Sequence, residues 1–187
     1  MNTKQNYKLG RDCNKTKSVS DALMSRECEK KSSMGGDVLC SESAFEALKR
    51  KDIDLYIVAR MLSETGCRIS EVLQMWGTDI NMSGKVLIRS KKKGNNRVCN
   101  ISNQFIKEIP RAGQSCELIQ DKDRFYFYRE FKKVGISLSI EGYERNRVTH
   151  AFRHEYTKQI RTLTTEKDVI KNALGHKSEK SQENYGR

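Results

Sequence analysis

The chain has 187 residues, of which 36% are hydrophobic, and this length and composition suit one main domain with a sizeable core. Lysine and arginine total 36 against 24 acidic residues, so the net charge is +12 and nucleic acid is the commonest class of partner. No stretch of 18 apolar residues occurs and residues 1–30 are polar, which excludes a transmembrane helix and a visible secretory signal. A basic protein without a nucleic-acid role stays open on charge alone.

The six cysteines indicate free thiols rather than a zinc site. They form no CxxC pair, and no histidine lies close to them in the sequence. Free thiols are typical of a reducing cytoplasm, so we expect a cytoplasmic protein without a metal. The six are Cys13, Cys28, Cys40, Cys67, Cys99 and Cys116.

Residues 1–39 predict a basic, flexible arm or linker ahead of a folded domain over residues 40–187. The arm is rich in lysine, serine and asparagine, and it offers too little apolar surface to offset the entropy lost on ordering. A small folded module is the alternative, because a weak helical pattern runs from about Ser20 to Lys31.

The domain begins with a mostly helical pattern. Residues 41–51 predict an amphipathic helix that a serine caps. Residues 52–66 are apolar on nearly every side, which suits a buried helix that ends at Gly66, and another helix is expected over about 69–75.

Residues 85–102 differ from this pattern and predict a β-hairpin with a basic tip. Two short β-prone runs flank a Gly-Asn turn. Helices return after it, so the fold class is mostly α with a small antiparallel β-sheet (α+β). They are expected as a short helix before Pro110, a helix ending at Gly135, and helices at about 147–162, 166–174 and 178–185.

The helix at 147–162 has an apolar side and a polar side at 100° per residue. The apolar side holds Val148, Phe152, Tyr156 and Ile160. The polar side holds His150, Arg153, His154 and Thr157. For this helix alone, a solvated polar face is the favoured interpretation, although His150 and Arg153 project together.

Arg68 follows the glycine that ends the buried helix and begins the next helix. An arginine there can join backbone N–H groups in binding a phosphate oxygen. A surface pair with Glu71, three positions on, is the favoured interpretation for this residue alone.

The hairpin tip carries Lys91, Lys92 and Lys93, which suit contact with a phosphate backbone, with a merely charged turn as the alternative. A lysine whose pKa is lowered by neighbouring cations can also donate a proton to a leaving oxygen.

All three histidines lie in the last 38 residues, together with Arg153 and Tyr185. No HExxH spacing occurs, so phosphate chemistry is favoured over a metal. Two arginines and a histidine donor can stabilise the extra charge of a phosphorane without a metal. A tyrosine that attacks DNA stores the broken bond as a phosphotyrosine, so rejoining needs no ATP or other cofactor.

The ordered set TGCRISE, KKGNNR, THAFRH, ALGH and a tyrosine nine positions later resembles the tyrosine recombinases, the phage-integrase-like enzymes that break and rejoin DNA. Each motif alone is weak, but all five occur in order over about residues 40–185. The resemblance implies the DNA breaking-rejoining catalytic-domain fold.

The resemblance also implies a role for each matching position. Arg68 and Arg153 would clamp the scissile phosphate, and His176 would donate to a non-bridging oxygen. Lys93, with Lys92 as the alternative, would be the general acid for the leaving 5′-hydroxyl. His150 would assist proton removal from Tyr185, which would form the 3′-phosphotyrosyl bond. The residues expected on DNA are Lys91, Lys92 and Arg97.

The function expected from this resemblance is site-specific recombination or integration on double-stranded DNA, by a homo-oligomer, a tetramer on paired sites. The setting would be a prokaryotic cytoplasm, a phage or another mobile element, and the chain would be a domain of a longer integrase or a minimal recombinase. A type IB topoisomerase and a cleavage-inactive DNA-binding regulator are the alternatives.

Overall fold

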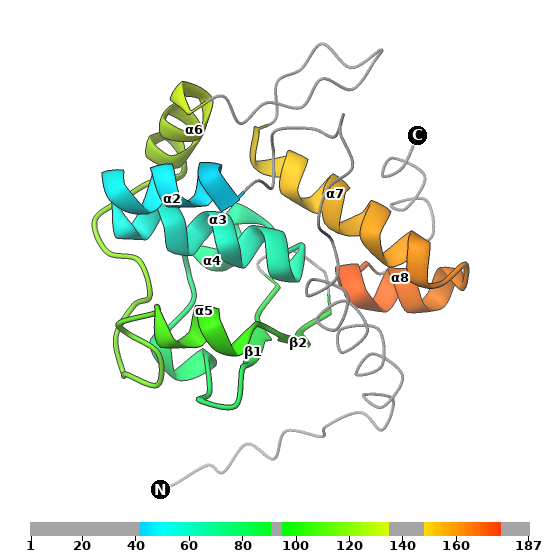
Figure 1. Ribbon diagram of the computed structural model, residues 1–187. Helices are drawn as coiled ribbons and strands as arrows, with labels where there is room; N and C mark the ends of the chain where they lie inside the picture. Colours follow the sequence, from blue (N-terminus) through cyan, green and yellow to red (C-terminus); the bar gives the residue numbers. More distant parts are fainter. Residues whose placement is uncertain (1–41, 91–94, 135–147, 177–187) are drawn as a thin grey trace, which may run out of the picture.

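The computed structural model describes residues 42–90, 95–134 and 148–176, which Figure 1 draws in colour. These residues form a mostly helical domain with a two-stranded antiparallel sheet, which confirms the predicted fold class. The predicted arm, the tip of the hairpin and the predicted helix at 178–185 lie outside the described residues. Among the helices that are described, none is long and apolar enough to cross a membrane.

The secondary structure follows the predicted order. The elements are α2 (Glu42–Lys51), α3 (Ile53–Thr65), α4 (Ile69–Val72), the short 3₁₀ helix η2 (Gly77–Asp79), β1 (Lys85–Ile88), β2 (Arg97–Asn100), α5 (Asn103–Lys107), α6 (Arg124–Lys133), α7 (Val148–Leu163) and α8 (Lys167–Leu174).

Helix α3 is the central element, and it packs against α2 and α7 (Figure 1). Nearly all of its residues are buried, as its all-round apolar pattern predicts. Asp52 caps its first turn by accepting a hydrogen bond from the Asp54 amide, and Gly66 ends it with φ +58°.

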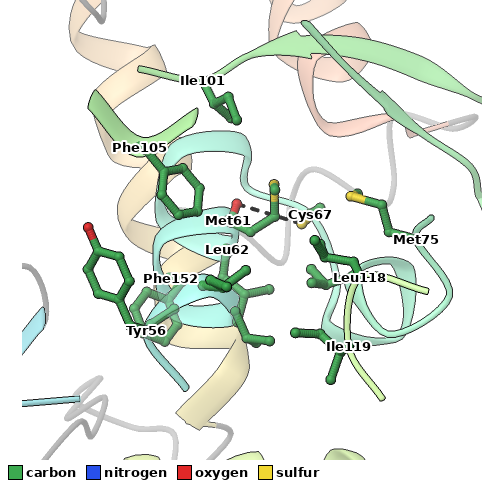
Figure 2. Close-up of a cluster of buried hydrophobic side chains, with 14 of the residues drawn as sticks. Tyr56, Met61, Leu62, Cys67, Met75, Ile101, Phe105, Leu118, Ile119 and Phe152 are labelled. Atoms are coloured by element: carbon green, nitrogen blue, oxygen red, sulfur yellow. Dashed lines mark hydrogen bonds between the residues drawn. The ribbon is translucent and has the colours of Figure 1, made fainter. Parts of the chain in front are cut away.

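The core collects apolar side chains from α3, from the segment after β2 and from α7, as Figure 2 shows. The rings of Tyr56 and Phe105 meet edge to face with centroids 6.0 Å apart. Phe152 enters from α7, while Leu118 and Ile119 enter from the loop before α6. Burial of each such side chain contributes about 1.5–3 kcal/mol, so this core holds the junction after α3 firmly in place.

The hairpin has the predicted strands, with Lys85 opposite Asn100 and Ile88 opposite Arg97. Side chains on a strand alternate between the two faces of a sheet. In β2, Val98 is exposed whereas Arg97 and Cys99 are buried. Arg97 therefore points into the domain, toward α3 and α8, which both contact β2.

The helix predicted over 69–75 is shorter than expected, because α4 ends at Val72. The chain then turns at residues 73–74 and pairs with residues 116–118: the Leu118 amide donates to the Met75 carbonyl at 2.8 Å, and the Gly77 amide donates to the Cys116 carbonyl at 2.8 Å. Pairing with this distant segment ends the helix, and no local spacing in the sequence signals it.

Candidate active site

Arg68 lies at the junction of α3 and α4, where its side chain is 28% exposed. Its backbone N–H donates to Glu71 Oε2 at 2.9 Å and its Nη1 donates to Glu71 Oε1 at 3.0 Å. The predicted pair with Glu71 is confirmed. The pair holds the Arg68 side chain in place, so the junction presents a positioned guanidinium.

Arg153, on α7, is only 1% exposed, so the prediction of a solvated polar face is wrong at this residue. Its Nη1 donates to the Gly66 carbonyl and its Nη2 donates to the Leu174 carbonyl, both at 2.6 Å. These carbonyls lie at the C-terminal ends of α3 and α8, where backbone acceptors lack partners within the helix and carry partial negative charge. One guanidinium thus joins two helix ends.

Close packing of α7 on the end of α3 makes this arrangement possible. A Cβ atom added to Gly66 would lie 2.2 Å from Tyr156 Cδ1, and the residue has a positive φ that favours glycine. Gly66 therefore serves both the turn and the approach of α7, which carries Arg153.

His176 is brought to the same place by the turn that ends α8. Gly175 ends the helix with φ +64°, and the His176 amide donates to the Lys171 carbonyl at 2.9 Å. His176 Nε2 then lies 2.8 Å from Arg153 Nη2. A guanidinium has no acceptor, so Nε2 accepts this bond and the proton of the neutral ring is assigned to Nδ1.

The electrostatic surroundings keep His176 neutral at pH 7. Burial, followed by the positive charges of Arg153, Arg68 and Arg97, lowers the pKa of His176 to about 4, against a smaller opposing effect of Glu71. Three arginines from different parts of the chain therefore disfavour the charged form of His176. A phosphate anion at this point would meet a positive field.

Glu71 and Arg97 complete the cluster. Glu71 is 2% exposed, and its Oε2 lies 3.3 Å from Arg97 Nη2. Burial by itself would raise the pKa of Glu71, but Arg97 and then Arg68 outweigh burial and lower it. The sequence predicts Arg97 on DNA; strand alternation puts Arg97 and Cys99 on one face of β2, and the packing of β2 against α3 and α8 makes that face the inward one.

Four of the predicted site residues therefore meet: Arg68, Arg97, Arg153 and His176. His150 lies one helical turn before Arg153, in the first turn of α7, and is partly buried. The remaining predicted residues, Lys91, Lys92, Lys93 and Tyr185, lie outside the described residues. Within the described ranges, no group of three His, Cys, Asp or Glu side chains is arranged to hold a metal ion.

Comparison with known proteins identifies the family. The sequence profile described as "Phage integrase family" matches residues 41–187. The chain belongs to the phage integrase family. The match includes every residue of the cluster and also Lys93 and Tyr185.

One curated relative is a "probable integrase/recombinase protein" of Methanocaldococcus jannaschii. It is 29% identical over 138 residues, which covers 65% of this chain and 42% of the relative. The chain thus spans about two fifths of the length of this relative.

Solved structures show the same fold. The catalytic domain of bacteriophage HP1 integrase superimposes with a TM-score of 0.58 at 22% identity, over 78% of this chain and 84% of that domain. A lambda integrase tetramer bound to a Holliday junction superimposes with a TM-score of 0.55 at 16% identity, over 92% of this chain and 58% of that one. The described domain therefore has the fold of integrase catalytic domains.

Proposed function

We propose that residues 40–187 form the catalytic domain of a site-specific DNA recombinase, which cleaves and rejoins DNA through a covalent bond to Tyr185. The observation that carries the proposal is the convergence of Arg68, Arg153 and His176 from three separate parts of the chain. Such a cluster suits the transition state of phosphoryl transfer between two oxygens, because the positive charge of the cluster is in place before the reaction begins.

The charge balance of the cluster favours an anion. Arg68, Arg97 and Arg153 bring three positive charges, and Glu71 brings one negative charge. Neutral His176 adds none at pH 7. The surplus would stabilise the extra negative charge on the non-bridging oxygens of a phosphorane.

His176 would act as a hydrogen-bond donor in this step. An incoming phosphate anion raises the pKa of a neighbouring imidazole, which makes a proton on Nε2 more favourable. Arg153 holds the ring by its own bond to Nε2, so donation to phosphate requires that this bond be exchanged. The family resemblance assigns this role to His176.

Three residues would complete the reaction. Tyr185 would attack the phosphorus atom and form the 3′-phosphotyrosyl bond while the bond to the 5′-oxygen breaks. Lys93, or Lys92 in its place, would give that oxygen its proton, and His150 would assist removal of the tyrosine proton. Attack by the free 5′-hydroxyl would reverse these steps and release Tyr185, without ATP or another cofactor.

The partner would be double-stranded DNA, with Lys91 and Lys92 on its backbone. The lambda integrase structure cited above is a tetramer on a Holliday junction, which supports the proposal that this chain acts as a homo-tetramer on paired sites.

A suicide substrate tests the proposal. A binding site is first selected from random duplexes, and a nick beside the cleavage position then lets the short 5′-hydroxyl strand escape. The wild-type protein should form a covalent protein–DNA adduct on a denaturing gel, and Tyr185→Phe should form none. Equal behaviour of the two proteins would remove Tyr185 as the nucleophile.

The same preparation distinguishes a recombinase from a topoisomerase. A supercoiled plasmid with two selected sites should give recombined products, whereas a plasmid without sites should stay supercoiled. Relaxation of both plasmids without exchange would favour the topoisomerase instead.

A further inference from the structure

Arg97 is a charged residue in an unusual position, on the inward face of β2 and only 9% exposed. Its Nη2 lies 3.3 Å from Glu71 Oε2. Its Nε and Nη1 are buried and have no hydrogen-bond acceptor in the part of the chain that the structure describes. Buried donors without acceptors reduce stability, so a purely structural site would favour an apolar side chain here.

Arg97 shares Glu71 with Arg68. Glu71 binds the backbone and the side chain of Arg68 and also the side chain of Arg97. With Arg68 alone, the carboxylate would cancel the positive charge that faces solvent. With Arg97 as a second partner, the three groups together keep one positive charge.

Arg97 also contacts the turn that carries His176. A Cβ atom added to Gly175 would lie 2.8 Å from Arg97 Nη1 and 3.1 Å from the Asn95 carbonyl oxygen. The absence of a side chain at Gly175 therefore lets the base of the hairpin pack directly against this turn. The charge of Arg97 acts on His176 together with the charges of Arg153 on α7, Arg68 at the junction before α4 and Glu71 on α4.

We propose that Arg97 is a positioning residue of the active site, which balances Glu71 and supports the Gly175 turn so that Arg68 and His176 face the same phosphate. This inference rests on the proposed function. Positioning of these groups, rather than direct contact with DNA, would be the main role of Arg97. Through Arg97, the hairpin that bears the lysines would be linked to Glu71 and to the Gly175 turn.

The planar fork of an arginine suits this role. Its Nη2 faces Glu71 while its Nη1 lies against Gly175, so one side chain serves both neighbours. A lysine would supply the charge as a single point and serve only one of them. Arg97→Lys and Arg97→Met therefore separate the loss of geometry from the loss of charge.

Three readouts test the inference. They are single-turnover cleavage of the nicked substrate, the salt dependence of binding in a Tyr185→Phe background, and the NMR titration of His176. Arg89→Met is the matched control, because Arg89 lies at the other base of the hairpin and pairs with Asp79 outside the cluster. Thermal unfolding of each variant shows that it is folded.

The expected results distinguish positioning from DNA contact. Cleavage should fall by about 10²-fold in Arg97→Met and by about tenfold in Arg97→Lys, since small misplacements of reacting groups have effects of this size. The salt slope of binding should stay that of the wild type in both, and Arg89→Met should cleave normally. The pKa of His176 should rise above its value of about 4 in Arg97→Met only, while burial, Arg153 and Arg68 still hold it below the usual value.

Other outcomes would overturn the inference. A salt slope lower by about one in Arg97→Met would make Arg97 a phosphate contact on DNA. Normal cleavage by Arg97→Lys, or an unchanged pKa of His176 in a folded Arg97→Met, would also contradict it. If Arg97→Met does not fold, the cleavage and salt slope of Arg97→Lys decide. If the wild type itself forms no adduct, the proposed function fails, and the titration of His176 still tests the link to Arg97.

Discussion

At the scale of single residues, Arg153 and Arg68 contribute unequally to the stability of the fold. Arg153 is buried and binds two helix-end carbonyls, whereas Arg68 is partly exposed and binds a carboxylate that Arg97 also holds. Loss of Arg153 leaves two buried acceptors without their donor. After loss of Arg68, the Glu71 carboxylate still has Arg97 as its partner.

We therefore predict that Arg153→Ala and Arg68→Ala both lower cleavage by roughly 10³-fold, by analogy with charge-stabilising arginines in phosphoryl transfer. The free energy of unfolding should fall by about 2–5 kcal/mol in Arg153→Ala and by about 1 kcal/mol or less in Arg68→Ala. Urea unfolding monitored by circular dichroism measures both values. Equal losses of stability would show that Arg153 does not join the two helix ends.

His176 predicts a specific dependence of stability on pH. Its pKa is about 4 in the folded protein, below the usual 6.5, so the unfolded chain binds the proton first as the pH falls. The folded state should lose stability between these two values, and this contribution should be constant below the lower one. His176→Gln removes the contribution, while His154, whose pKa is also lowered by burial, stays in both proteins.

Thermal unfolding at several pH values compares the wild type with His176→Gln. The difference in midpoint between them should change across this window in the direction that destabilises the wild type at acid pH. Parallel curves would mean that His176 titrates normally in the folded protein.

At the scale of elements, the end of α3 determines where the site forms. Gly66 combines a left-handed backbone with direct contact to Tyr156, whereas Gly113 has a similar backbone, φ +75°, and open space where an added Cβ atom would lie. Substitutions at the two glycines therefore distinguish the effect of backbone strain, which both share, from the effect of a clash with α7, which only Gly66 has.

Gly113→Ala should lower the free energy of unfolding by only about 1–2 kcal/mol, the strain of a left-handed alanine. Gly66→Ala should lower it by about 3 kcal/mol or more, because overpacking adds to that strain. Chemical denaturation of both variants tests the difference. Equal losses would mean that α7 yields easily and that its packing does not position Arg153.

The elements themselves were largely predictable from local pattern. The apolar run of α3 with its terminal glycine, the two strands and the helices α7 and α8 all lie close to their predicted bounds. The length of α4 was not predictable from local pattern, because pairing of Met75 and Gly77 with residues 116–118 ends this helix.

The sequence predicted which residues belong to the site, but it did not predict which groups these residues contact. The order of the motifs indicated Arg68, Arg153 and His176, yet Arg153 was expected on a solvated face. Its acceptors, Gly66 and Leu174, lie 87 and 21 positions away, so helical periodicity carries no signal of its burial. The inward direction of Arg97 likewise depends on how β2 packs against α8.

At the scale of the whole molecule, the net charge of +12 predicts binding to DNA that weakens steeply with salt. Replacement of Lys91 or Lys92 by alanine should lower the slope of log affinity against log salt by about one each, if each contacts a phosphate. Lys122→Met is the control, since two carboxylates, Asp52 and Asp54, already hold this ammonium group. Fluorescence anisotropy at several salt concentrations measures the slopes; an unchanged slope in the Lys91 and Lys92 variants would remove those contacts.

The proposed reaction involves the whole domain, because it joins a cluster built from α4, β2, α7 and the turn after α8 to a tyrosine near the end of the chain. The most direct measurement is mass spectrometry of the covalent adduct after digestion with protease and nuclease. We predict a nucleotide joined through its 3′-phosphate to the peptide that contains Tyr185. A nucleotide on any other residue, or one joined through a 5′-phosphate, would contradict it.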